Sequence, residues 1–201
     1  MIQYYRELTR LEMEQIDRER TIVLIPLGAL EQHGNQAPLG TDGLIADTMP
    51  RYLKEELLAA DPDFPMLIFP TIPIGLSTEH KNFCGSVTLK PDTYYHMLYD
   101  IGASLAHHGF KKIAFLVCHG GNTPIVQVLS RELRSLFVRL PGGAGGGTYL
   151  LLLGDRLGPG PLFSAFPGAV FWLTAGGGGV GGMPGGQQPG GGVHDHVAGQ
   201  G

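Results

Sequence analysis

The 201-residue chain has little of several features that define large classes of protein. Its two cysteines, Cys84 and Cys118, are too few for a disulfide framework, and both are typical of small buried residues. No apolar run approaches the length of a membrane-spanning helix, and the first residues carry no signal-peptide pattern. With a formal net charge of -4, the chain has no basic excess to attract nucleic acid or an anionic membrane. We therefore expect a cytoplasmic protein with neither kind of partner.

Charge and large apolar side chains are also scarce in the last third. Residues 141–201 hold 22 of the 32 glycines and three charged residues. Such low-complexity sequence buries too little apolar surface to offset the entropy lost on ordering. We expect residues 1–140 to form the core, and 141–201 to be a poorly ordered remainder of the same domain with short apolar elements at 148–153 and 169–174.

The first part alternates between continuous apolar runs and segments of helical period. Strands are predicted at 21–27, 66–74 and 112–118. A helix is predicted after each of them, following Asp42, from Pro91, and following Asn122. This alternation indicates an α/β fold with a mostly parallel sheet covered on both faces.

The predicted helices carry internal signals. The first has one apolar face, at Ile45, Met49, Leu53 and Leu57, and contains Pro50, which would kink it or move its start. The second ends near Gly109, where a C-cap glycine belongs. The third places six apolar residues on one side: Ile125, Val126, Leu129, Leu133, Leu136 and Phe137.

Polar residues with metal-ligand chemistry follow the first strand. Glu31 and His33 lie two positions apart in its loop, and Asp42 stands where the next helix begins. Open α/β folds place their catalytic and binding residues at the carboxyl edge of the sheet, where such a loop lies. Alternatively, Asp42 is a helix N-cap, and the histidine is an ordinary residue of a glycine-rich loop.

A second such loop follows the third strand. His119 precedes Gly120, Gly121 and Asn122, and the glycines allow backbone to approach a ligand closely. A turn histidine with Asn122 as N-cap is the alternative. Together the two loops supply two carboxylates and two histidines, enough to hold one or two divalent ions.

Three short motifs lie in order along the chain. Residues 31–34 read Glu-Gln-His-Gly, continued by Pro-Leu-Gly-Thr-Asp at 38–42; residues 75–80 read Gly-Leu-Ser-Thr-Glu-His; residues 118–122 read Cys-His-Gly-Gly-Asn. In this order and spacing they resemble the metal motifs of the creatininase (creatinine amidohydrolase) family. The resemblance covers about residues 20–137.

This resemblance implies a three-layer α/β/α sandwich with a dinuclear centre of zinc, manganese or iron. It also implies hydrolysis of a non-peptide C–N bond in a cyclic or linear amide by metal-activated water, and a homo-oligomer, commonly a hexamer. One branch of the family acts on a modified peptide. The resemblance does not specify which small-molecule amide is the substrate.

The resemblance also assigns roles by position. It implies four metal ligands, Glu31, His33, Asp42 and His119. Glu31, Asp42 and His119 would hold one ion, and His33 with the bridging Asp42 the other. Glu79 and His80 would be catalytic or supporting residues beside them.

The chain departs from creatininase proper at Gly121, where that enzyme has a glutamate, and so resembles the other branches. These supply the missing acidic ligand from a later His-Ala-Gly-Glu segment. The nearest match here, residues 195–201, has Gln200 in the acidic position, which leaves the second ion short of a ligand. A reading-frame slip after about residue 139 or a truncated, divergent member would explain this.

Three functions therefore remain open. The first is a metal-dependent amidohydrolase. The second is a catalytically inactive metal-binding or oligomer subunit. The third is an α/β binding domain without metal, in which Glu31 and Asp42 are structural.

Overall fold

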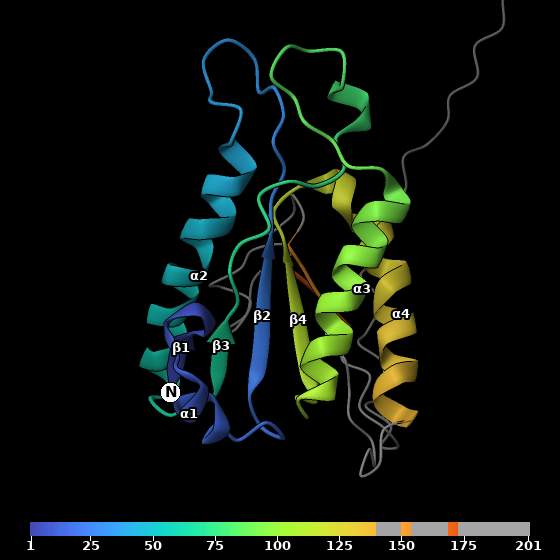
Figure 1. Cartoon of the computed structure of the whole chain (residues 1–201). Coiled ribbons are helices and arrows are strands. Elements are labelled where there is room, and N and C mark those ends of the chain that lie inside the picture. The colour runs from blue at the N-terminus through green and yellow to red at the C-terminus, as the bar shows by residue number, and fades with distance from the viewer. Residues whose placement is uncertain (140–149, 154–168, 173–201) are drawn as a thin grey trace, which may run out of the picture.

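A parallel sheet of four strands, in the order β1-β3-β2-β4, forms the middle of the molecule (Figure 1). The computed structural model describes residues 1–139, 150–153 and 169–172. The strands are β1 (Ile2–Tyr4), β2 (Ile22–Leu27), β3 (Met66–Ile68) and β4 (Lys112–Val117). β2 and β4 pair along their full length, from Ile22 opposite Lys112 to Leu27 opposite Val117. The carboxyl ends of β2, β3 and β4 therefore share one edge.

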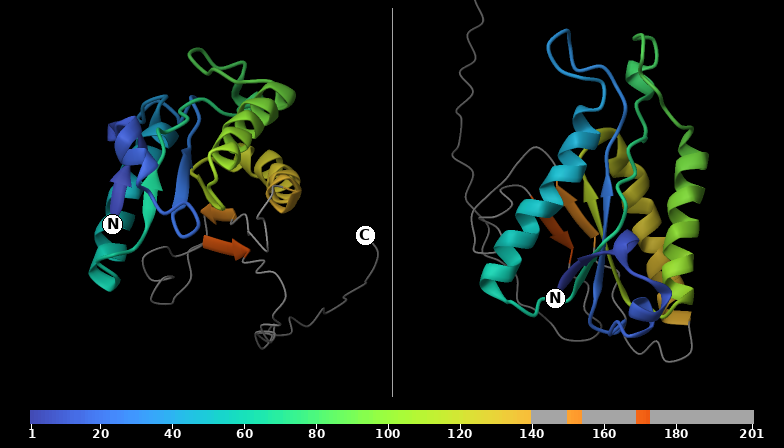
Figure 2. Two further views of the ribbon diagram at one scale, coloured as in Figure 1. Left: turned by 60° about the horizontal axis from the view of Figure 1, so that its bottom comes forward. Right: turned by 60° about the vertical axis from the view of Figure 1, so that its left-hand side comes forward.

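The helices lie on both faces of this sheet (Figures 1 and 2). α2 covers one face, and α3 and α4 cover the other. The described helices are α1 (Arg10–Glu14), α2 (Thr41–Ala60), α3 (Pro91–His107) and α4 (Thr123–Arg139), with 3-10 turns η1 (Tyr5–Glu7), η2 (Thr78–His80) and η3 (Gly120–Asn122). An antiparallel pair, β5 (Leu150–Leu153) and β6 (Ala169–Trp172), is placed with β5 beside β4.

Two separate apolar cores confirm the three-layer α/β/α architecture. Because successive strand residues point to opposite faces, Val23 and Ile25 of β2 pack toward α3 and α4, whereas Leu24 packs toward α2. Leu98 on α3 belongs to the first core and Leu53 on α2 to the second. β2 and β4 are thus buried on both faces, as their continuous apolar sequences predict.

The strand predicted at 66–74 is too long. β3 ends at Ile68, and the only later pairing among the described residues of this segment is an isolated bridge between Leu27 and Ile72. Pro70 and Pro73 supply no N–H for a ladder. The short β1 was not predicted, since three residues give no detectable alternation.

The predicted face of α2 is half wrong. Leu53 and Leu57 are buried, but Ile45 is 43% exposed, and the buried face runs instead through Gly43, Ala46 and Pro50. Close packing at the sheet explains this rotation: a Cβ on Gly28 would lie 2.8 Å from the Cα of Gly43. α2 continues through Pro50, and its start is not displaced.

The observed start of α2 contradicts the N-cap interpretation of Asp42. α2 begins at Thr41, its N-cap is Gly40, and Asp42 lies inside the first turn with its side chain buried. A carboxylate in a first turn still interacts favourably with the helix dipole. Its burial, however, needs a partner that the helix itself does not supply.

The other helix predictions fare better. Gly109 has φ of 92° after α3, and its N–H and that of Phe110 bond the carbonyls of Ala106 and Leu105, a Schellman motif. On α4, Val126, Leu129 and Leu133 are fully buried. The side chains of Leu136 and Phe137 lie outside the described part.

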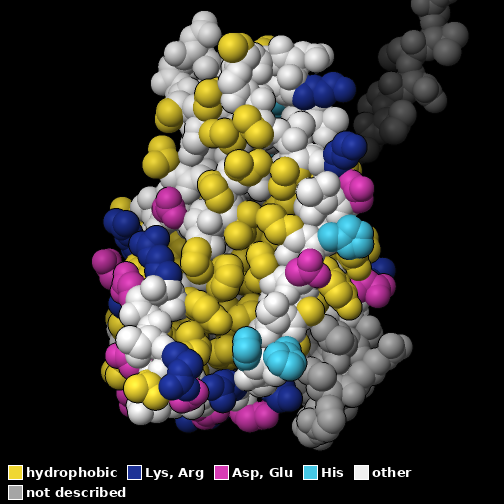
Figure 3. All heavy atoms as spheres, viewed as in Figure 1, with side chains coloured by type: hydrophobic (Ala, Val, Ile, Leu, Met, Phe, Trp, Pro, Cys, Tyr) yellow, Lys and Arg dark blue, Asp and Glu magenta, His cyan; other side chains and the backbone are white. Residues whose placement is uncertain are grey.

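The predicted boundary between 1–140 and 141–201 remains a prediction, because most of the second segment lies outside the described residues. Of its predicted apolar elements, the structure describes strands at Leu150–Leu153 and Ala169–Trp172. No helix within the described ranges has the length and apolarity needed to cross a bilayer. Figure 3 shows apolar side chains gathered in the middle of one face, between α2 and α3.

Candidate metal centre

The four predicted ligands meet at the carboxyl edge of the sheet. Glu31 lies in the loop after β2, Asp42 in the first turn of α2, and His119 one residue beyond the position that follows β4. These three residues are 5%, 6% and 9% exposed, respectively. His33 lies at the more open side, with its side chain 27% exposed. Residues separated by up to 88 positions thus form one cluster because their strands are parallel neighbours.

Asp42 lies between two imidazoles. Its Oδ1 is 3.2 Å from Nε2 of His33, and its Oδ2 is 3.0 Å from Nδ1 of His119. Glu31 closes the cluster, with Oε2 3.4 Å from Nε2 of His119. Single donor atoms of Glu31, His33 and Asp42 all lie within 4.8 Å of one another.

Backbone carbonyls determine which nitrogen of each ring carries a proton. His33 Nδ1 lies 3.1 Å from the carbonyl oxygen of Glu31, and His119 Nε2 lies 2.7 Å from that of Leu76. A carbonyl accepts and never donates, so both of these nitrogens are N–H donors. In the neutral rings, the lone pairs of His33 Nε2 and His119 Nδ1 therefore face the oxygens of Asp42.

Lone pairs facing carboxylate oxygens at this distance need a positive charge between them. Glu31 Oε2 and Asp42 Oδ2 are buried and accept no hydrogen bond in the described part of the chain. Two buried carboxylate oxygens without donors carry a large desolvation cost. Divalent cations would satisfy the carboxylate oxygens and the imidazole lone pairs together, so the residues present fit a metal centre.

The electrostatics of His119 agree with this interpretation. Burial alone would lower the pKa of His119, but the hydrogen bond of the protonated ring to Asp42, the contact with the Leu76 carbonyl and the charge of Glu31 together raise it. The site thus attracts a cation at Nδ1, as a proton or as a metal. Cys118 does not compete, since burial raises the pKa of its thiol to about 12.

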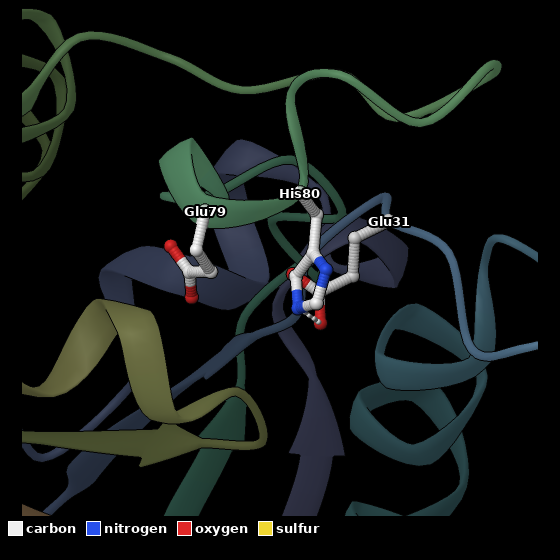
Figure 4. Close-up of side chains that lie close together, drawn as sticks. All are labelled: Glu31, Glu79 and His80. Atoms are coloured by element: carbon white, nitrogen blue, oxygen red, sulfur yellow. Dashed lines mark ion pairs between the residues drawn. The ribbon is translucent and has the colours of Figure 1, made fainter.

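Glu79 and His80 lie on η2, at the more exposed side of the cluster, which we call its open side. His80 Nε2 is 3.6 Å from Glu31 Oε1, and Figure 4 shows these two side chains directed toward one another with Glu79 beside them. Donor atoms of Glu31, Glu79 and His80 lie within 4.8 Å of one another, so this second group could also hold an ion. Glu79 is exposed.

Gln32 orients His80. The Gln32 Oε1 accepts from the N–H of Gly34 at 2.9 Å, which leaves Nε2 to donate to His80 Nδ1 at 3.0 Å. The neutral His80 ring therefore carries its proton on Nε2, facing Glu31. This arrangement favours His80 as a hydrogen-bond donor over His80 as a metal ligand.

Gly121 has no room for a side chain. A Cβ there would lie 2.2 Å from the carbonyl oxygen of Leu76 and 2.5 Å from His119 Nε2. The glutamate expected in creatininase proper does not fit this backbone. Gly120 is different, with nothing within 4 Å of its Cβ position.

Asn122 has a role that the sequence did not reveal. It precedes α4, as an N-cap would, but its side chain bonds the N–H of Leu76 and the carbonyl of Gly28. The sequence carries no local signal for this role, because both bonding partners lie far away along the chain. Residues 195–201, the nearest match to the missing acidic ligand, lie outside the described residues.

A family model described as creatininase, creatinine amidohydrolase, matches residues 6–158. The chain belongs to the creatininase family. Its three motifs and its parallel sheet are those that the family resemblance implies. The match covers the whole of the candidate metal centre.

Individual relatives agree with membership of the creatininase family. A mycofactocin precursor peptide peptidase of Mycobacterium tuberculosis is 33% identical over 119 residues, 58% of this chain and 47% of the relative. A creatinine amidohydrolase of Pseudomonas putida is 28% identical over 137 residues, 65% of this chain and 50% of the relative. The chain thus spans about half the length of these curated relatives.

Solved structures support the fold. The structure named "Creatininase Mn" superposes with a TM-score of 0.61 at 23% identity, covering 77% of this chain and 59% of that chain. At this identity the likeness extends to the fold alone. It agrees with the α/β/α arrangement described above.

Proposed function

We propose that the protein is a metal-dependent hydrolase of a C–N amide bond in a cyclic or linear amide. The centre would hold two divalent ions, of zinc, manganese or iron. Glu31, Asp42 and His119 would bind one, and His33 with Asp42 the other, Asp42 being shared. Carboxylate oxygens and neutral imidazoles without thiolate suit these metals.

The position of Asp42 carries the proposal. Each of its oxygens faces a different imidazole nitrogen, at 3.2 Å and 3.0 Å, and both nitrogens present lone pairs. A carboxylate placed this way has one cation position on each side. A purely structural Asp42 would instead face hydrogen-bond donors.

The reaction needs an activated water and a polarised carbonyl. Divalent ions at this centre would supply both, by lowering the pKa of a water and acting as Lewis acids. The chain contributes geometry: His119 and His33 are held by backbone carbonyls, so their free nitrogens stay directed at Asp42. Positioning of this kind lowers the reorganisation cost of the reaction.

Residues at the open side would assist proton transfer during the reaction. We assign this role to His80 and Glu79, whose 3-10 turn lies beside Glu31. His80 holds a proton on Nε2 because Gln32 donates to its other nitrogen. This N–H would donate a hydrogen bond to the reacting amide, and the proton released by the attacking water would pass through Glu79 to the leaving nitrogen.

A peptide amide is the second candidate substrate. The relatives named mycofactocin precursor peptide peptidase are 33–35% identical to this chain, against 28% for the creatinine amidohydrolase. Gly121 also lacks space for the glutamate of creatininase proper.

We further propose a cytoplasmic homo-oligomer, a hexamer as in the family, to which the apolar face in Figure 3 would contribute.

The test combines metal content with turnover. The full chain is loaded with Zn²⁺, Mn²⁺ or Fe²⁺, its bound metal is counted, and creatinine, N-formyl amides and short peptides are offered. We expect two ions per chain and hydrolysis of one class. Tightly bound metal without hydrolysis of any class would establish the inactive subunit instead.

Single alanine variants of Glu31, His33 and His119 complete this test. Each should lower the metal content, whereas Asp47→Asn, an exposed carboxylate of the same helix as Asp42, should not. Unchanged metal content in all three variants would support the binding domain without metal.

A further inference from the structure

The Asn122 side chain joins three loops that leave the sheet at one edge. It is fully buried, its Oδ1 accepts from the N–H of Leu76 at 2.9 Å, and its Nδ2 donates to the carbonyl of Gly28 at 2.9 Å. Gly28 follows β2, Leu76 follows β3, and Asn122 follows β4. One amide therefore connects the segments that follow three strands.

The peptide of Leu76 is held on both sides. Its N–H donates to Asn122, and its carbonyl accepts from Nε2 of His119 at 2.7 Å. Hydrogen bonds in such a chain polarise one another when they are buried. The position of Asn122 is thus transmitted through one peptide group to the imidazole.

Two glycines allow this arrangement. A Cβ at Gly75 would lie 2.3 Å from Asn122 Oδ1, and one at Gly121 would lie 2.2 Å from the Leu76 oxygen. Both distances are far inside van der Waals contact. The backbone on each side of the amide has therefore been kept free of side chains.

We infer that Asn122 is a positioning residue for His119. It fixes the Leu76 peptide, whose carbonyl holds the proton of the imidazole on Nε2 and so directs Nδ1 at Asp42 Oδ2, 3.0 Å away. Within the described part of the chain, the Asn122 side chain bonds Leu76 and Gly28 but none of the four ligands, while its backbone N–H donates to the carbonyl of His119 at 3.2 Å. The side chain therefore acts on the centre through Leu76. Its bearing on catalysis rests on the proposed function, but its effect on the ring does not.

The test compares Asn122→Ala with Asn122→Asp and with a core control. N122A removes both bonds, whereas N122D keeps the acceptor for the Leu76 N–H and loses the donor to Gly28. Leu129→Ala, on α4, removes a fully buried core side chain and lowers stability without touching this network. It therefore reports what destabilisation alone does.

The first readout is the imidazole ¹⁵N spectrum of His119 in the metal-free protein at alkaline pH, where the ring is neutral. The wild type and N122D should show the proton on Nε2, and N122A a mixture of both tautomers. L129A should match the wild type. The second readout is Zn²⁺ affinity, which N122A should weaken by about 10- to 100-fold and L129A should leave unchanged.

Two results overturn the inference: N122A with the wild-type spectrum and affinity, or L129A with effects as large as those of N122A. If N122A does not fold, the wild type still decides, because a His119 proton found on Nδ1 refutes the assignment directly. A wild type that binds no metal or cleaves no amide refutes the proposed function, while the spectrum continues to test the role of Asn122.

Discussion

The two sides of the centre differ in how their residues are held. On the inner side, the side chains of Glu31, Asp42 and His119 are 7–8% exposed. On the outer side, those of His33 and His80 are 27% and 28% exposed. Residues of the same ligand types are thus buried on one side of the site and partly exposed to solvent on the other.

This difference separates two tasks. A buried carboxylate without hydrogen bonds is costly unless a cation accompanies it, so the inner side is suited to retaining metal. The outer side is open to water and to an amide, and His80 there is oriented by the side chain of Gln32. We therefore expect variants of the proposed ligands, His33 included, to lose metal, and variants of His80 to lose turnover with metal retained.

Asp42→Asn tests the inner side and should have the largest effect. The amide keeps the size of the side chain but removes the charge shared between His33 and His119. Metal content should fall to near zero, and turnover by roughly 10³-fold, because metal Lewis acidity is worth several kcal/mol and each 1.4 kcal/mol is about tenfold. Metal analysis with kinetics measures both, and two ions retained in D42N would contradict the shared ligand.

His80→Ala tests the outer side. Metal content should stay at the wild-type level, while turnover falls by about 10²-fold through loss of a positioned proton. The exposed His108 provides the control, since H108A should change neither quantity. Loss of one ion in H80A would instead identify His80 as a ligand and remove the distinction between the two sides.

The sequence predicts that Glu31 and His119 lie close together for a specific reason. Glu31 and His119 follow the two strands with the clearest apolar runs, 21–27 and 112–118, and parallel strands bring their carboxyl ends together. The fold class followed from the same alternation. The structure shortened these strands by one residue each, to Ile22–Leu27 and Lys112–Val117.

Features that depend on close approach were beyond the sequence. The rotation of α2 follows from contact between Gly28 and Gly43, and this contact, not the apolar pattern, turns Asp42 inward. Similarly, Asn122 reads as an N-cap, because its bonds to residues 46 and 94 positions away leave no local pattern. The early end of β3, by contrast, has a local cause, since Pro70 supplies no N–H for the ladder.

Gly121→Ala tests whether the backbone of the inner side has room for a methyl group. Its methyl group would overlap the Leu76 oxygen and His119 Nε2, so we expect a loss of about 1–3 kcal/mol of stability and weaker metal binding. Gly120→Ala is the matched control, with open space at the added methyl. Denaturant unfolding measures the difference, and equal stability of the two variants would contradict the close contact.

The smallest expected effect is a dependence on pH that belongs to the inner side. In the metal-free protein the pKa of His119 is raised above its usual 6.5, because the bond to Asp42 and the charge of Glu31 outweigh the opposing effect of burial. A group with a raised folded-state pKa contributes stability that is fully present below its unfolded value. This contribution is lost as the pH rises through the folded-state pKa.

Denaturant unfolding of the metal-free wild type and of His119→Gln across this range measures the contribution. The stability of the wild type relative to H119Q should decline as the pH rises above about 6.5. Zinc should act in the opposite direction, because it competes with the proton for Nδ1 and binds more tightly as the ring is deprotonated. If the two unfolding curves stay parallel with pH, the proton is not shared with Asp42, and the inner side does not hold its cation at that nitrogen.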